Sequence, residues 1–293
     1  MTRRAASLAL LPLLLPSTAA LAQVSPYLPE KGQFILTPGF NFQTYDRFWL
    51  GTDKQDFPVT DQILASAVSE YGLFRDLALD LTLGYTRTTG TRPEAGTDSG
   101  LDDTTFGLRW RPVDEFRFDS PLVPTLALRV GGIIEGTYHE GLAESPGDGA
   151  SGYEASLLVG KSILDTGLGV VGLVGYRDRT EGVPSDLLAS AGAYYVLLER
   201  ISLSFGYQLV KGLSGNDIGD PGFEFPQVRE ISHTLQAGLG FIDNAGRQYN
   251  LYFAWVIAGR NTAQKQIYGF NIVFPFGERV EAPDPFGGTA AGY

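Results

Sequence analysis

The sequence predicts an all-β protein, namely a transmembrane antiparallel up-and-down β-barrel of about twelve strands. Three observations predict this fold. An apolar segment of export-signal type begins the chain, about a dozen stretches that alternate apolar and polar residues follow, and the connections between them alternate in length. Outer-membrane barrels combine these features, because their strands alternate between lipid and lumen and their periplasmic turns are shorter than their outer loops.

Residues 1–22 have the three parts of a secretory signal: two arginines near the start, an apolar run at 8–15, and small residues at Ala20 and Ala22. We expect cleavage after Ala22. The paired arginines also allow the twin-arginine route. We favour the general secretory route because the rest of the twin-arginine motif is weak.

Composition excludes several other classes. The net charge of −11 offers no electrostatic footprint for nucleic acid, and the absence of cysteine removes disulfides and thiolate metal sites. No stretch after the signal has the roughly 20 consecutive apolar residues that a membrane helix needs. A membrane-spanning form must then be a closed barrel, because lipid leaves unpaired backbone groups without partners.

The predicted strands are separated by connections whose lengths alternate. The strands lie at 32–45, 60–72, 76–89, 101–113, 122–138, 151–163, 168–180, 185–197, 201–213, 229–242, 247–259 and 265–276. Tight turns follow the second, sixth, eighth and tenth strands, whereas long polar connections follow the first, third, fifth and ninth, at 46–59, 90–100, 139–150 and 214–228. Twelve strands with both chain ends in the periplasm place every long connection outside; ten or fourteen strands stay open as alternatives. The apolar second half of 214–228 suggests that this loop folds into the barrel mouth.

The alternation assigns a lipid face to each strand in turn, because neighbouring side chains in a strand point to opposite faces. The residues expected to face lipid are Leu77, Leu79, Leu81, Leu83 and Tyr85 in the third strand, Phe106, Leu108 and Trp110 in the fourth, Leu126, Leu128, Val130 and Ile134 in the fifth, Ile201, Leu203, Phe205, Tyr207 and Leu209 in the ninth, Leu251, Phe253, Trp255 and Ile257 in the eleventh, and Tyr268, Phe270, Ile272, Phe274 and Phe276 in the twelfth. An aromatic last strand is typical of barrels that the outer-membrane barrel assembly machinery recognises. We therefore expect a barrel over 23–276 and a flexible periplasmic tail, rich in Gly, Pro and Ala, over 277–293.

The same alternation points a set of charged residues into the lumen, and these are the pore-lining candidates: Asp80, Arg109, Arg129, Glu135 and Glu154. An Arg facing lipid at mid-depth costs roughly 2–4 kcal/mol, so such groups belong inside. Two interpretations stay open. The charges form a selectivity region across a pore, or they pair and fill a narrow barrel.

Catalytic, metal and cofactor sites are not predicted. His139 and His233 are the two histidines, and Ser232 next to His233 points to the opposite face of its strand. Several loops are acidic, but their spacing matches no calcium-binding loop. We interpret them as solvated loops that divalent ions bridge to lipopolysaccharide.

Two segments carry a family resemblance. Residues 99–111 read SGLDDTTFGLRWR and 205–216 read FGYQLVKGLSGN. The first resembles a strand of the MetA-pathway of phenol degradation-like outer-membrane protein family, with Asp103, Gly107 and Trp110 at matching positions and Asp102 where that family has Gly. The resemblance implies an outer-membrane channel, often near pathways for aromatic or other hydrophobic compounds, and it transfers no catalytic residue.

The sequence thus leads us to expect a channel for passive uptake or export of small molecules in the bacterial outer membrane, with both termini periplasmic. Its expected partners are outer-membrane lipid, lipopolysaccharide, a small-molecule solute and the barrel assembly machinery. A closed structural or surface-interaction barrel is the first alternative. A lipid-active enzyme of the outer membrane is the second.

Overall fold

The computed structural model describes residues 25–90, 97–118, 120–140, 145–163 and 166–277. The expected signal peptide and all of the expected tail except Gly277 lie outside these residues. Within the described ranges no helix is long and apolar enough to cross a membrane, a criterion that does not apply to proteins that cross with strands.

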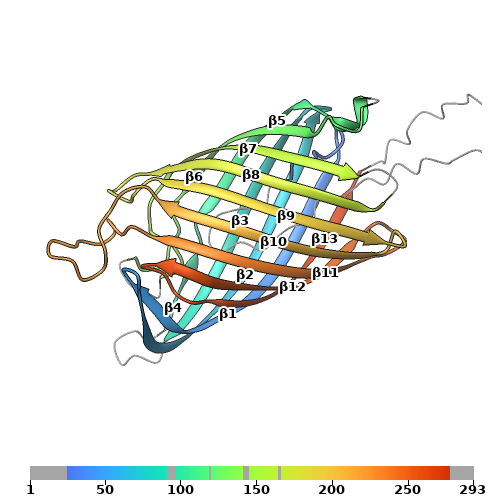
Figure 1. The fold of residues 1–293 in the computed structure, drawn as a ribbon. Helices are drawn as coiled ribbons and strands as arrows, with labels where there is room; N and C mark the ends of the chain where they lie inside the picture. Colours follow the sequence, from blue (N-terminus) through green and yellow to red (C-terminus); the bar gives the residue numbers. More distant parts are fainter. Residues whose placement is uncertain (1–24, 91–96, 119, 141–144, 164–165, 278–293) are drawn as a thin grey trace, which may run out of the picture.

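The chain forms one antiparallel sheet that closes on itself (Figure 1). Its strands are β1 (Phe34–Leu50), β2 (Asp53–Phe74), β3 (Leu77–Gly90), β4 (Thr97–Leu101), β5 (Thr104–Val113), β6 (Thr125–Ile134), β7 (Gly152–Ile163), β8 (Leu168–Arg179), β9 (Asp186–Leu197), β10 (Ile201–Gly212), β11 (Ile231–Ile242), β12 (Gln248–Arg260) and β13 (Gln266–Phe276), with one short 3-10 helix, η1 (Glu115–Arg117). Strands that follow one another in the chain are paired, except that β4 and β5 both pair with β3 and not with each other, and β1 also pairs with β13 to close the barrel.

Strands β4 and β5 together make one barrel strand. Both pair with β3, β4 along residues 85–89 and β5 along residues 77–82. The interruption falls at Asp102 and Asp103, where the Asp103 carboxylate accepts hydrogen bonds from the Gly136 backbone N–H (3.0 Å) and the Tyr138 hydroxyl (2.7 Å). Counted around the wall, the barrel has twelve strands, which confirms the predicted fold.

The outer and inner surfaces of the wall differ as the alternation predicted. On β5 the outward Phe106, Leu108 and Trp110 are 38–52% exposed, whereas the intervening Arg109 is fully buried inside the barrel. Large exposed apolar side chains recur along the strands over the outside of the barrel. This belt and the closed sheet are those of an outer-membrane barrel.

The first hairpin extends further than predicted. Residues 46–59 were expected to form a long loop, but β1 and β2 continue through most of this range and meet at the short turn of Gly51 and Thr52. Aromatic packing explains the difference, because the Phe57 ring lies 5.8 Å from that of Tyr45 and 5.3 Å from that of Phe48.

The connection between β10 and β11 was expected to fold into the barrel mouth. Figure 1 shows instead that it projects beyond the end of the barrel. Two residues of this connection contact neighbouring strands. Ile218 packs against Tyr45 and Phe48 of β1, and Asp217 forms an ion pair with Arg260 of β12. Its apolar residue Ile218 is thus covered by the first hairpin.

Candidate functional site inside the barrel

A single row of cross-strand partners brings five buried charged residues together on the inner face of the wall. The row runs through Glu70 on β2, Asp80 on β3, Gly107 on β5, Gly131 on β6, Glu154 on β7, Arg177 on β8 and Asp186 on β9. Its charged members are only 3–6% exposed. Because barrel strands tilt, such a row climbs along the barrel axis. It leads from near the end of β2, beside the short turn to β3, to the first residue of β9.

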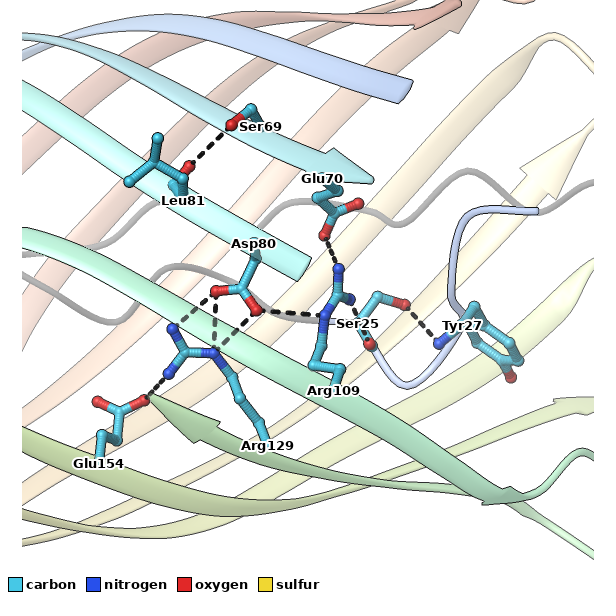
Figure 2. Close-up of polar contacts among 9 residues, drawn as sticks. All are labelled: Ser25, Tyr27, Ser69, Glu70, Asp80, Leu81, Arg109, Arg129 and Glu154. Carbon is cyan, nitrogen blue, oxygen red and sulfur yellow. Dashed lines mark hydrogen bonds and ion pairs between the residues drawn. The ribbon is translucent and has the colours of Figure 1, made fainter. Parts of the chain in front are cut away.

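Arg109 links Glu70 and Asp80, the first two members of this row, to the N-terminal segment, residues 25–33 (Figure 2). Its Nη2 lies 2.7 Å from Glu70 Oε1 and its Nε lies 3.5 Å from Asp80 Oδ2. Its Nη1 donates to the Ser25 carbonyl at 3.0 Å. Two carboxylates and one backbone carbonyl therefore surround this fully buried guanidinium.

Arg129 fills the gap that the two glycines leave in the row. Its guanidinium contacts Asp80 Oδ1 at 2.7 Å on one side and Glu154 Oε1 at 2.7 Å on the other (Figure 2). A Cβ added at Gly107 would lie 2.6 Å from Arg129 Nε, and one at Gly131 would lie 3.1 Å from Arg129 Nη1. The absence of side chains at these two positions is what lets Arg129 lie flat against the wall.

These contacts shield the side chains from solvent. Arg109, Arg129, Asp80 and Glu154 are at most 5% exposed. Taking charges out of water is costly unless their partners compensate. Within this group two arginines are paired with two carboxylates. Removing one of the four side chains would therefore leave another charge buried without its partner.

The N-terminal segment enters the barrel at the end where the short turns lie. The Tyr27 hydroxyl donates to Glu115 Oε1 at 2.8 Å, and Glu115 also accepts from Lys161 Nζ at 2.8 Å and from the Ser162 backbone N–H. Tyr27 is 8% exposed. The segment is thus held in the lumen through the Ser25 carbonyl on Arg109 and Tyr27 on Glu115, and its last residues also form backbone hydrogen bonds with Gly72.

Four of the five predicted residues meet in this arrangement: Asp80, Arg109, Arg129 and Glu154. Glu135 does not, because it follows the last residue of β6 and is exposed. The sequence reasoning missed Glu70, Arg177 and Asp186. The same inward alternation applied to the second, seventh and eighth predicted strands would have found them.

The two histidines lie apart from the charged row. His139 Nδ1 is 3.1 Å from Asp98 Oδ1 in an exposed position, and His233 Nδ1 is 2.7 Å from the Tyr207 hydroxyl. Ser232 is buried on the opposite face of the wall, so it does not pair with the neighbouring His233. In the part of the chain that the structure describes, no group of three His, Asp or Glu side chains is arranged to hold a metal ion.

Comparisons with known proteins point to the same architecture. No protein-family model and no curated protein sequence matches the chain. The crystal structure of the COG4313 outer membrane channel from Pseudomonas putida F1 is similar with a TM-score of 0.68 and 16% sequence identity, covering 85% of this chain and 97% of that one. At this identity the similarity establishes a shared fold.

Two more distant solved structures are also outer-membrane barrels. The KdgM porin has a TM-score of 0.41 and 11% identity, covering 82% of this chain and 99% of that one. The TodX monoaromatic hydrocarbon channel, in a deltaS2 mutant, has a TM-score of 0.41 and 10% identity, covering 85% and 90%.

Proposed function

We propose that this chain is an outer-membrane channel that passes small molecules passively between the outside and the periplasm. One observation carries the proposal: the lumen of a closed, lipid-facing barrel is lined by polar and charged groups and holds the chain's own N-terminal segment. The segment adds no strand to the wall. Its withdrawal would therefore widen the lumen while the barrel stays intact.

In this proposal Asp80, Arg109, Arg129 and Glu154 line the pore. Arg109 loses a hydrogen bond to the Ser25 carbonyl when the segment leaves, and its guanidinium then faces the solute path. Fixed charges of both signs on one wall would select solutes by charge and size. The barrel would lie in the outer membrane among lipid and lipopolysaccharide, placed there by the barrel assembly machinery, with its short turns and both termini in the periplasm.

Aromatic or hydrophobic compounds are the narrower proposal for the solute. The family resemblance of residues 99–111 supports it. Swelling of protein-containing liposomes in phenyl glucoside, compared with methyl glucoside at equal osmolarity, tests this choice, because both solutes are uncharged and differ in the aromatic ring. Swelling that is faster in methyl glucoside than in phenyl glucoside would overturn it.

Single-channel conductance in a planar bilayer tests the channel role. The experiment compares the folded protein with a variant that lacks residues 25–28. We expect small discrete steps from the whole protein and larger steps from the variant, because the variant lacks both anchored groups of the segment. Silence from both folded proteins would overturn the proposal.

A closed structural barrel is the second candidate, and the burial of the charged row favours it. The lumen side chains Arg109, Arg129, Asp80 and Glu154 are only 0–5% exposed. In that case the ion pairs pack the interior of the barrel and do not line a pore. A protein that shows no conductance in the bilayer and that resists unfolding would support this second function.

A further inference from the structure

Three residues form a cradle for the ring of Tyr27 at the end of the barrel where the short turns lie: Glu115, Phe116 and Gly160. The Tyr27 hydroxyl donates to Glu115 Oε1 at 2.8 Å, and the centre of its ring lies 6.1 Å from that of Phe116. A Cβ added at Gly160 would lie 2.9 Å from the Tyr27 hydroxyl oxygen and 3.0 Å from Tyr27 Cζ. The absence of a side chain at Gly160 therefore makes the room that the phenol ring occupies.

The hydrogen-bond acceptor of the cradle is fixed independently of Tyr27. Glu115 is 5% exposed, and its Oε2 lies 2.8 Å from Lys161 Nζ. The Ser162 backbone N–H donates to both Glu115 oxygens, at 3.0 and 3.1 Å. Lys161 Nζ is itself held by the Val123 carbonyl at 3.0 Å. A carboxylate that is already held in this way loses little freedom when it accepts a further hydrogen bond, so it is preorganised for a hydroxyl donor.

A second phenol hydroxyl lies beside the cradle. Tyr194 is 5% exposed, and within the described ranges its hydroxyl has no hydrogen-bond partner. The Tyr194 ring covers Gly169, where an added Cβ would overlap it, and Gly169 is the cross-strand partner of Ser162. Buried polar groups are normally hydrogen-bonded. The surroundings of the cradle therefore have a hydrogen-bonding capacity that Tyr27 leaves unused.

Tyr27 reaches the cradle on a segment that contributes no strand to the wall. Its backbone N–H donates to Ser25 Oγ of the same segment, at 3.1 Å. The wall thus recognises the side chain of Tyr27 through its hydroxyl and the face of its ring, which are features that every simple phenol has. A free phenol can make the same two contacts.

We propose that Glu115, Phe116 and Gly160 form a binding site for small uncharged phenols, which Tyr27 occupies until a solute displaces it. The proposal rests on the channel role proposed above and names phenols as its solutes. The site would discriminate against the same ring without a hydroxyl, because Glu115 would then lack a charge-assisted hydrogen bond. Tyr27 acts as a tethered competitor, whose effective concentration at the site is high.

Calorimetric titration of the folded protein with 4-hydroxybenzamide tests the site, and benzamide is the matched probe that lacks only the hydroxyl. We expect Tyr27→Ala to bind 4-hydroxybenzamide about tenfold or more tightly than the wild type, because the tethered ring no longer competes. The same variant should bind benzamide about tenfold more weakly, the effect of one hydrogen bond to a charged acceptor.

Two glycine substitutions in the Tyr27→Ala background locate the bound ring. Gly160→Ala should abolish the binding of 4-hydroxybenzamide, because the added methyl takes the space of the ring. Gly172→Ala on β8 should leave it unchanged, since the nearest neighbour of its added methyl is at 3.4 Å. In the wild type, 4-hydroxybenzamide should also speed protease cleavage of residues 25–33 from the side of the short turns, and benzamide should not.

Binding and cleavage are measured without conductance, so this inference and the channel role fail separately. Equal affinity of Tyr27→Ala for the two probes would overturn the inference, even in a protein that conducts. Binding that Gly160→Ala leaves unchanged would do the same, because the ring would then lie elsewhere. Cleavage that is equal with both probes would overturn the displacement of Tyr27. A protein with the expected binding and no conductance would overturn the channel role and leave the binding site standing.

Discussion

Arg109 and Arg129 face each other as direct cross-strand partners on β5 and β6, both pointing into the lumen. Like charges in this relationship destabilise a sheet. Asp80 resolves the conflict, because its carboxylate lies 3.5 Å from Arg109 Nε and 2.7 Å from Arg129 Nη2. Glu70 and Glu154 complete the set at its two ends. The five groups form an alternating chain of charges along the wall.

Asp80→Asn should strongly destabilise the barrel, because it leaves two guanidiniums facing each other in a buried site. Removing one partner of a buried ion pair costs about 3–5 kcal/mol. Urea unfolding of the protein in lipid vesicles measures the change in the free energy of unfolding. Asp56→Asn is the control, since Asp56 is fully exposed on the first hairpin. Equal midpoints for the two variants would contradict the central role of Asp80.

Gly107→Ala should destabilise the protein by displacing Arg129. The added methyl would lie 2.6 Å from Arg129 Nε, and overpacking of this kind costs about 1–3 kcal/mol. The same urea titration measures the effect. Gly172→Ala on β8 provides the comparison, because its nearest neighbour is the Ser190 carbonyl oxygen at 3.4 Å. We expect Gly172→Ala to have a small effect, and an equally large one would show that Arg129 does not need the space.

Tyr27→Phe should loosen the N-terminal segment without unfolding the barrel. The change removes the hydrogen bond to Glu115, worth about 0.5–1.5 kcal/mol, while Glu115 keeps Lys161 and the Ser162 N–H as partners. Protease added from the side of the short turns should then cleave the segment faster. Tyr85→Phe on the lipid face is the control. Unchanged cleavage in Tyr27→Phe would mean that Tyr27 does not anchor the segment.

Asp217 joins the β10–β11 connection to Arg260 and Asn261 at the end of β12, and this clasp should weaken in acid. Asp217 accepts hydrogen bonds from Arg260 Nε at 2.6 Å and Asn261 Nδ2 at 2.8 Å, and these hydrogen bonds hold the pKa of Asp217 below its usual range. Its stabilisation is therefore present above the ordinary Asp pKa of about 3.9 and is lost as the pH falls through the lower folded value.

Protease cleavage within residues 213–228 at pH 3 and pH 7 measures this loss. We expect the wild type to be cleaved faster at pH 3, relative to an unfolded reference peptide. Asp217→Asn should be cleaved fast at both pH values, because it lacks the charge at each. A wild type with the same relative rate at both would show that Asp217 does not hold the clasp.

Only some residues of the candidate site could be predicted from the sequence, and the individual residues show why. The direction of a strand side chain depends on its position in the local alternation, so Asp80, Arg109, Arg129 and Glu154 were assigned to the lumen from their own strands. Glu135 obeys the same alternation, but β6 ends before it. The pairing of Arg129 with Asp80 and Glu154 depends on the register of β3, β5, β6 and β7, which no single strand contains.

The sequence by itself determined the barrel, its twelve strands and the two faces of its wall, because a period of two residues is a local property that burial on one side enforces. Only the tertiary structure decided which lumen charges meet, that Gly107 and Gly131 make room for Arg129, and that the connection between β10 and β11 projects beyond the end of the barrel. These features arise from contacts between segments far apart in the chain. Which residues make these contacts depends on strand register, strand tilt and loop packing. The alternation within a single strand does not determine any of the three.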